Sequence, residues 1–149
     1  MSEKMDGIRA YWDRTKLLSR RGKDISVPQW FLEDFPSIPL DGELWMGRGK
    51  YEQLIGIIKS TQRSWSEVKY VIFDLPSSKL PFESRWDQLK DLPLPSHVQL
   101  AEIWQCKDMQ QLKQLLDSVC NLGGEGLVAT KPQSHYTPGN NFNVFKVTV

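Results

Sequence analysis

Strand-like and helix-like runs alternate along this 149-residue chain, and this alternation limits the folds open to it. The β-branched and aromatic run at 68–75 is ended by Pro76, whereas 53–59 places Leu54, Ile57 and Ile58 at helical spacing. We expect further strands at 7–13, 17–19, 40–46, 97–103, 126–130 and 143–149, and helices at 27–32, 82–89 and 108–123. Mixed elements with many antiparallel connections predict the α+β class.

The composition is that of one globular domain, which we expect to occupy residues 1–149. The formal net charge of +1 neither favours nor excludes a nucleic-acid partner, because a local basic patch can be balanced elsewhere. No apolar run approaches the roughly 18 residues that span a bilayer. We therefore expect a soluble intracellular protein without a membrane partner, and the sequence does not distinguish the nucleus, a mitochondrion or the cytoplasm. Cys106 and Cys120 have no companions at metal-ligand spacing.

A lysine motif stands at the start of the chain. Lys4, Asp6, Gly7 and Arg9 follow the order Lys-x-Asp-Gly-x-Arg and run directly into the expected strand at 7–13. A lysine amine in its unprotonated form can attack phosphorus, so the motif favours nucleotidyl transfer. A lysine beside Asp-Gly is also typical of an exposed turn, and the interpretation therefore depends on the other motifs.

Four motifs follow in order: Leu40-Asp41-Gly42-Glu43-Leu44-Trp45, Tyr70-Val71-Ile72-Phe73-Asp74-Leu75-Pro76, Gly124-Glu125-Gly126-Leu127-Val128 and Val144-Phe145-Lys146-Val147. In this order and spacing the chain resembles the ATP-dependent DNA ligases over nearly its whole length. The segment Trp45-Met46-Gly47-Arg48-Gly49-Lys50-Tyr51-Glu52 is similar to the minimal ligases of bacteria, viruses and some eukaryotic lineages. The resemblance implies a two-sheet, ATP-grasp-like nucleotidyltransferase core of antiparallel sheets flanked by helices.

The resemblance also implies a role for each motif residue at an ATP site. Lys4 matches the lysine that attacks the α-phosphate of ATP, releases pyrophosphate and keeps AMP through a phosphoramidate bond. Arg9 matches a nucleotide-binding arginine, and Asp6 would shape the lysine loop at the cofactor site. Phe73 matches the aromatic residue that stacks on adenine, and Lys146 matches a lysine at the α-phosphate.

Acidic and basic residues complete the expected site. Glu43 and Glu125 match the carboxylates that serve the ribose and a divalent metal, Mg²⁺ or Mn²⁺. Arg20 matches the arginine that grips the 5′-phosphate of a nick, so nicked duplex DNA is the expected partner. From the residues alone, simpler interpretations stay open: Glu43 and Glu125 as solvated loop acids, Phe73 as a core side chain, and Arg9 and Arg20 as surface residues.

Thr130, Asn140 and Thr148 depart from the family pattern, because the family commonly has arginine at the first two positions and lysine at the third. All three changes remove a positive charge, which affects phosphate handling more than recognition of the base. The lysine motif also stands close to the first residue, and the last motif close to the final one. We expect an adenylation domain incomplete at its N-terminus and without the OB-fold domain, which a partner chain would then supply.

The expected function is that of an ATP-dependent DNA ligase adenylation domain, whose lysine takes AMP for transfer to the 5′-phosphate of a nick in DNA repair and replication. Two alternatives stay open at this point. The mRNA-capping guanylyltransferases and RNA ligases share the Lys-x-Asp-Gly core. The loss of three cations also fits a catalytically degenerate domain that still binds nucleotide or DNA.

Overall fold

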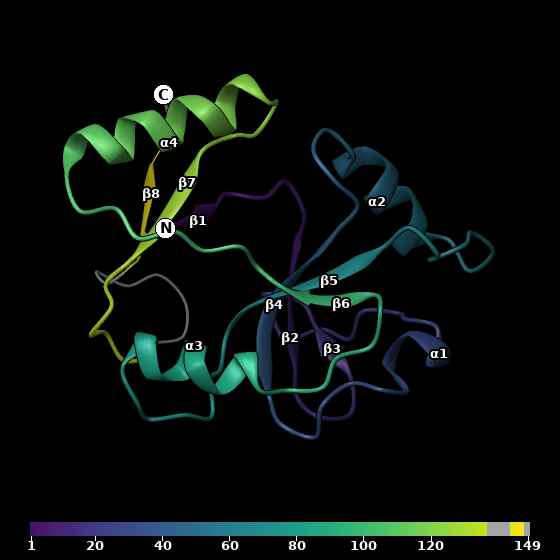
Figure 1. Ribbon diagram of the computed structural model, residues 1–149. Coiled ribbons are helices and arrows are strands. Elements are labelled where there is room, and N and C mark those ends of the chain that lie inside the picture. Colours follow the sequence, from purple (N-terminus) through teal and green to yellow (C-terminus); the bar gives the residue numbers. More distant parts are fainter. Residues whose placement is uncertain (137–143, 148–149) are drawn as a thin grey trace.

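The computed structural model describes residues 1–136 and 144–147 and divides them between two sheets with flanking helices (Figure 1). The strands are β1 (Ser2–Glu3), β2 (Ile8–Trp12), β3 (Leu17–Leu18), β4 (Leu40–Trp45), β5 (Lys69–Asp74), β6 (Val98–Leu100), β7 (Leu127–Thr130) and β8 (Val144–Val147). The helices are α1 (Gln29–Leu32), α2 (Tyr51–Lys59), α3 (Phe82–Lys90) and α4 (Met109–Asn121). This arrangement confirms the expected α+β class and the two-sheet core.

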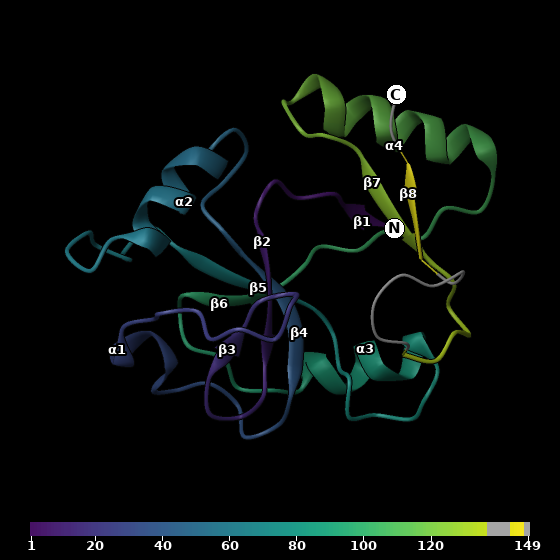
Figure 2. The ribbon, with the colours of Figure 1, turned by 180° about the vertical axis from the view of Figure 1, so that it is seen from behind.

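The larger sheet has the strand order β3-β2-β4-β5-β6, and all its pairs are antiparallel except β5 with β6. The smaller sheet has the order β1-β7-β8 and is antiparallel. In both views of the ribbon, the chain leaves the smaller sheet at β1 and enters the larger one at β2 (Figures 1 and 2). The lysine motif therefore lies in the crossing between the two sheets.

The expected elements are present with shifted ends, and two differences have a clear physical cause. The strand expected at 97–103 is regular only over Val98–Leu100, because it pairs in parallel with β5 and then leaves the sheet toward α4. The two-residue β1 was not expected, since so short a strand carries no periodicity of its own and exists by pairing with β7. Of the strand expected at 143–149, the structure describes 144–147.

The main core lies on the larger sheet, where side chains of β2, β4 and β5 pack against residues from the loops and helices. Tyr70 is fully buried, and its hydroxyl donates to the carbonyl of Ala10 at 2.8 Å. Its ring passes so close to Gly42 that a Cβ there would lie 2.8 Å from the ring and 2.5 Å from the carbonyl oxygen of Val71. The glycine of the Asp-Gly-Glu motif is thus required by packing.

The aromatic residues and cysteines have mostly structural roles. Trp12 and Trp65 are buried, whereas Trp30 is 47% exposed beside His97. Cys106 and Cys120 are free thiols.

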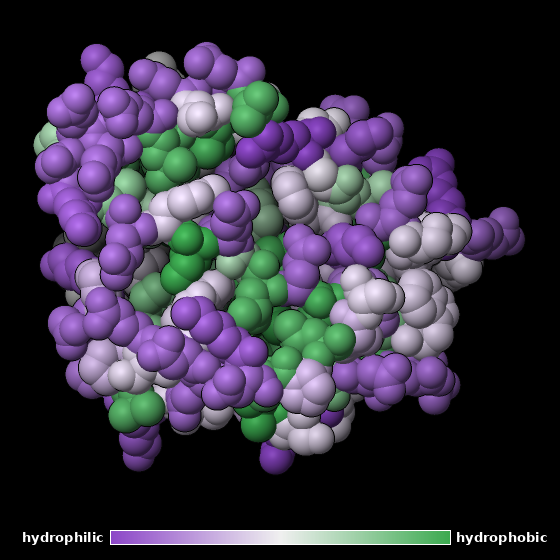
Figure 3. Space-filling view, in the orientation of Figure 1, coloured by the Kyte–Doolittle hydropathy of each residue, from purple (hydrophilic) through white to green (hydrophobic). Residues whose placement is uncertain are grey.

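On the face seen in Figure 3, hydrophobic side chains gather along the middle of the molecule and hydrophilic ones cover its margins. Within the described residues, no helix has the length and apolar character needed to cross a bilayer.

Candidate functional site

A cleft of about 620 Å³ lies between the two sheets and collects residues from both. Six of the eight residues predicted for the site line it: Lys4, Arg9, Arg20, Glu43, Phe73 and Lys146. The register explains part of this gathering, because Arg9 of β2 and Glu43 of β4 are direct partners in the ladder. Asp6 and Glu125 do not line the cleft, but both lie close enough to Glu43 to act on its charge.

Lys4 is held by the turn that precedes β7. Its backbone amide donates to the carbonyl of Gly126 at 2.8 Å, and its Nζ lies 3.6 Å from Oε2 of Glu125. The side chain of Lys4 is 32% exposed and that of Glu125 is 50% exposed, so solvent and a ligand can both reach the amine. The Gly-Glu-Gly motif therefore contributes a backbone acceptor and a carboxylate to the lysine loop.

Asp6 connects the lysine loop to the end of β4 and to the residues that follow it. One carboxylate oxygen accepts from Nε1 of Trp45 at 3.0 Å, and the other accepts from the backbone amide of Gly49 at 2.9 Å. Both oxygens are thus used within the protein, one by the last residue of β4 and the other by the loop that follows it. Gly7 comes next, and a Cβ there would collide with the carbonyl oxygen of Leu44, so only glycine lets the lysine loop lie against β4.

Glu43 is the most strongly perturbed acid of the site. Burial raises its pKa from the ordinary 4.5 to about 7, and the nearby charges of Asp6 and Glu125 act in the same direction. The guanidinium of Arg9 and the backbone amide of Gly7 favour the charged form and oppose this rise. A carboxylate with this burial and this acidic surrounding is suited to accept a cation or a hydroxyl donor.

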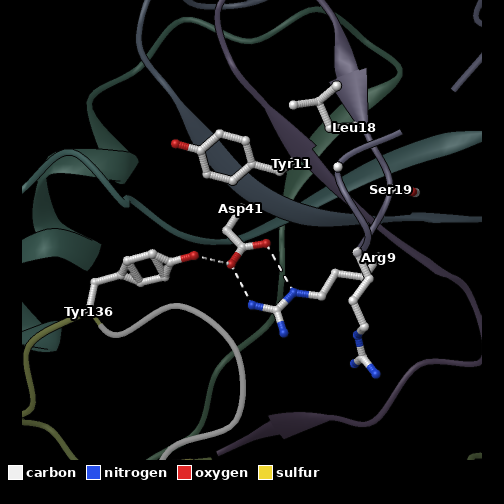
Figure 4. A pocket seen from close by; sticks show the side chains of 8 residues that line it. Arg9, Tyr11, Leu18, Ser19, Asp41 and Tyr136 are labelled. Atoms are coloured by element: carbon white, nitrogen blue, oxygen red, sulfur yellow. Dashed lines mark hydrogen bonds and ion pairs between the residues drawn. The ribbon is translucent and has the colours of Figure 1, made fainter. Parts of the chain in front are cut away.

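Arg9 is fixed by a carboxylate that the sequence did not mark as a site residue. Its Nη2 lies 2.6 Å from Oδ2 of Asp41 and its Nε lies 3.2 Å from Oδ1, while Asp41 is only 2% exposed. From the opposite side, the hydroxyl of Tyr136 donates to Oδ2 of Asp41 at 2.7 Å (Figure 4). Hydrogen bonding to Asp41 raises the pKa of Arg9, so the guanidinium stays positively charged.

Phe73 lines the cleft at a point where the pairing of β5 with β4 is irregular. Asp41 pairs with Asp74 and Gly42 pairs with Ile72, so Phe73 has no direct partner in the ladder. Such bulges change the direction of a side chain and are common beside active sites. The guanidinium of Arg9 lies 5.4 Å from the centre of the Phe73 ring, so a flat aromatic face and a fixed cation stand side by side.

The remaining predicted residues lie around the mouth of the cleft. Arg20 and Lys146 are exposed and line it, and Thr130 lines it as well, at the end of β7. Arg20 also lines an adjoining cavity of about 350 Å³ together with Arg9 and Asp41. Asn140 and Thr148 lie outside the described residues.

Sequence reasoning missed Asp41 and Tyr136. Asp41 stands in a quoted motif beside Gly42 and Glu43, so its position was a usable signal. Tyr136 gave none, because its partner lies 95 residues away in the chain.

Comparisons with known proteins agree with this geometry. The family model described as the ATP dependent DNA ligase domain matches residues 1–147. A DNA ligase of Haemophilus influenzae is 35% identical over an alignment of 151 residues, and the match covers 99% of this chain and 56% of that protein. A solved structure from a study of Lig E DNA ligases, described as binding DNA with a minimal scaffold, has a TM-score of 0.92 at 32% identity. The match covers 99% of this chain and 60% of the chain in that structure.

More distant structures share the fold. A Chlorella virus DNA ligase-adenylate has a TM-score of 0.83 at 20% identity, over 99% of this chain and 59% of that one. The ATP-dependent DNA ligase from bacteriophage T7, in complex with ATP, has a TM-score of 0.77 at 19% identity. The match covers 99% of this chain and 60% of that one. The chain thus spans somewhat more than half the length of each of these four relatives.

Proposed function

Because this chain belongs to the family of ATP-dependent DNA ligase domains, we propose that it works as an adenylation domain whose Lys4 takes AMP from ATP. The observation that carries the proposal is the gathering of Lys4, Arg9, Glu43, Phe73 and Lys146 around one cleft between the two sheets. The family match also favours a DNA ligase over the capping guanylyltransferases and RNA ligases that share the lysine motif.

The proposed reaction is a displacement at phosphorus. Nζ of Lys4, as the free amine, forms a bond to the α-phosphorus of ATP, the bond from that phosphorus to the bridging oxygen breaks, and pyrophosphate leaves. The nitrogen loses its proton in the process, which leaves AMP on Lys4 as a phosphoramidate. Glu125 lies 3.6 Å from Nζ, where its carboxylate orients the amine toward the cleft.

The other cleft residues suit the parts of the nucleotide. The ring of Phe73 offers a flat face to adenine, and its position beside Arg9 puts the ribose and phosphates within reach of that guanidinium. Asp41 and Tyr136 hold Arg9 in place for this contact. Lys146 supplies positive charge at the α-phosphate as charge develops there.

A divalent cation fits the acidic part of the site. Among residues 1–136 and 144–147, no three His, Cys, Asp or Glu side chains come together as a metal site. Mg²⁺ is commonly held by one or two carboxylates together with substrate phosphates, and Glu43 and Glu125 are two such carboxylates close enough to repel each other. Magnesium held there would balance the charge of the phosphates.

The second proposed step passes AMP to the 5′-phosphate of a nick in duplex DNA, with Arg20 at the mouth of the cleft as the contact to that phosphate. The relatives are longer than this chain, and we propose that sealing also needs an OB-fold domain from outside the matched region. In this second step an oxygen of the 5′-phosphate forms a bond to the phosphorus of AMP, the bond from that phosphorus to Nζ breaks, and Lys4 takes up a proton and is free again.

The test is to incubate the chain with ATP and magnesium and to measure its intact mass. We expect an AMP adduct on the wild type and on Lys113→Ala, which removes an exposed lysine of α4, but none on Lys4→Ala. A folded wild type that binds ATP in calorimetry yet forms no adduct would contradict the proposal and favour a degenerate nucleotide-binding domain.

A further inference from the structure

The segment that carries Lys4 is braced by the loop at residues 46–50, which we call the brace loop. Arg48 of this loop holds Glu3, the residue directly before Lys4, with two hydrogen bonds. Nε donates to Oε2 at 2.9 Å and Nη2 donates to Oε1 at 2.5 Å, and the Glu3 side chain is 15% exposed. A guanidinium paired with a carboxylate through both arms fixes direction as well as distance.

The same loop holds the other side of the lysine motif. Asp6, two residues after Lys4, accepts from the backbone amide of Gly49 at 2.9 Å. Gly47 and Gly49 have φ angles of 113° and 73°, in the left-handed region that favours glycine. These two glycines flank Arg48, so the backbone turns sharply on both sides of the side chain that reaches Glu3.

Arg48 also contacts the second segment that holds Lys4. Its Nη1 donates to the carbonyl of Leu122 at 3.3 Å, just after α4. The turn that follows supplies Glu125, near Nζ of Lys4, and Gly126, whose carbonyl accepts from the amide of Lys4. One guanidinium therefore ties the lysine loop to the turn that orients the lysine.

Arg48 does this from outside the cleft, since it is not among the residues that line it. It has no direct route to a nucleotide in the cleft, but a nucleophile displaced by about 1 Å can lose about 100-fold in rate. We propose that Arg48 is a positioning residue that aims Lys4 at the α-phosphate through Glu3 and the Leu122 turn. The inference rests on the proposed adenylation activity.

The experiment measures AMP transfer in a single turnover, with the 149-residue chain in excess over a series of ATP concentrations. In Arg48→Met we expect the rate constant at saturating ATP to fall about 10- to 100-fold. The ATP concentration for half-maximal rate should stay within about threefold, because Arg48 does not contact the nucleotide. Arg48→Lys keeps the charge without the two-armed geometry, so its rate should lie between those of Arg48→Met and the wild type. Arg63→Met removes an exposed arginine as the control and should behave as the wild type.

A double variant tests the route through Glu3. Because Arg48 and Glu3 act as one unit, Glu3→Gln combined with Arg48→Met should lose no more rate than the worse single variant. Three results would each overturn the inference. The rate losses of the two single variants could multiply in the double variant, or the ATP concentration for half-maximal rate could rise as much as the rate falls. The third is an unchanged rate in both Arg48 variants. Near-UV circular dichroism checks folding, and if Arg48→Met is unfolded, Arg48→Lys and Glu3→Gln give the same comparison.

The outcomes separate this inference from the proposed function. If the wild type forms no AMP adduct, both the proposed function and the positioning role of Arg48 are wrong. If the wild type is active and the Arg48 variants are equally active, only the positioning role is wrong.

Discussion

At the residue scale, close approach of neighbouring main chain explains two glycines of the motifs, Gly7 and Gly42. Gly7 lies against the carbonyl of Leu44, and Gly42 lies against Tyr70 and the carbonyl of Val71. In both cases the neighbour includes main chain, which cannot rotate away as a side chain can. The sequence motif therefore reports packing of the sheet as well as chemistry.

Gly42→Ala should destabilise the fold by about 1–3 kcal/mol, because the added methyl group overlaps a fixed carbonyl and a buried ring. Denaturant unfolding measures the difference. Gly56→Ala is the matched control: its methyl group meets only the movable end of Arg63, and alanine suits the interior of α2 better by about 1 kcal/mol. A Gly42→Ala protein as stable as the wild type would show that β4 and β5 can separate there.

Glu43 predicts a pH dependence of stability with a definite sign. Its pKa is raised from 4.5 to about 7 by burial, so the folded protein retains a proton that the unfolded chain releases. The corresponding stability is complete below pH 4.5 and is lost as the pH rises through 7. Relative to Glu43→Gln, the wild type should lose roughly 3 kcal/mol across this interval.

The measurement is the free energy of unfolding of both proteins from pH 4 to 8, with a chelator present to exclude divalent metal. Subtracting the Gln variant removes the contributions of all other titrating groups. Parallel curves would mean that Glu43 is solvated in the folded protein.

At the scale of elements, α4 is a helix whose start is set locally. The side chain of Asp108 accepts from the backbone amide of Gln111 at 2.8 Å and so caps the start of the helix. Figure 1 shows the helix across the smaller sheet, where Val119 is its buried residue. The bulge at Phe73 has no such local cause, because it depends on how β4 and β5 are paired.

Asp108→Ala should cost about 1 kcal/mol, because the backbone amide of Gln111 then loses its side-chain acceptor in the first turn. Thermal unfolding of this variant and of Asp117→Ala, which removes an exposed acid later in the same helix, makes the comparison. Equal losses in the two variants would argue against a specific cap.

At the scale of the whole molecule, the cleft depends on bridges between the two sheets. Tyr136 follows β7 of the smaller sheet and donates to Asp41 in β4 of the larger one. Arg85 of α3 forms a second bridge nearby. It is 1% exposed, pairs with Asp74 of β5 and donates to the carbonyl of Ser134, which follows β7. These bridges keep the segment after β7 beside the cleft.

Tyr136→Phe should lower stability by about 1–2 kcal/mol, because the hydroxyl is a partner of a buried carboxylate. The control is Tyr51→Phe at a tyrosine that is 46% exposed, which should change little. Denaturant unfolding compares the two. If both losses are equally small, water replaces the Tyr136 hydroxyl and the bridge does not contribute.

Local sequence determined most of the segments that form strands and helices, because periodicity, caps and prolines act over a few residues. The exception is β1, which exists by pairing with β7. The motifs also marked the residues that the cleft brings together, through the resemblance to the ligases. Tertiary structure alone decided the contacts between distant positions: Asp41 with Tyr136, Lys4 with Glu125 and Arg48 with Glu3. Such contacts depend on how the two sheets pair and pack, and this cannot be predicted from the conformational propensities of neighbouring residues.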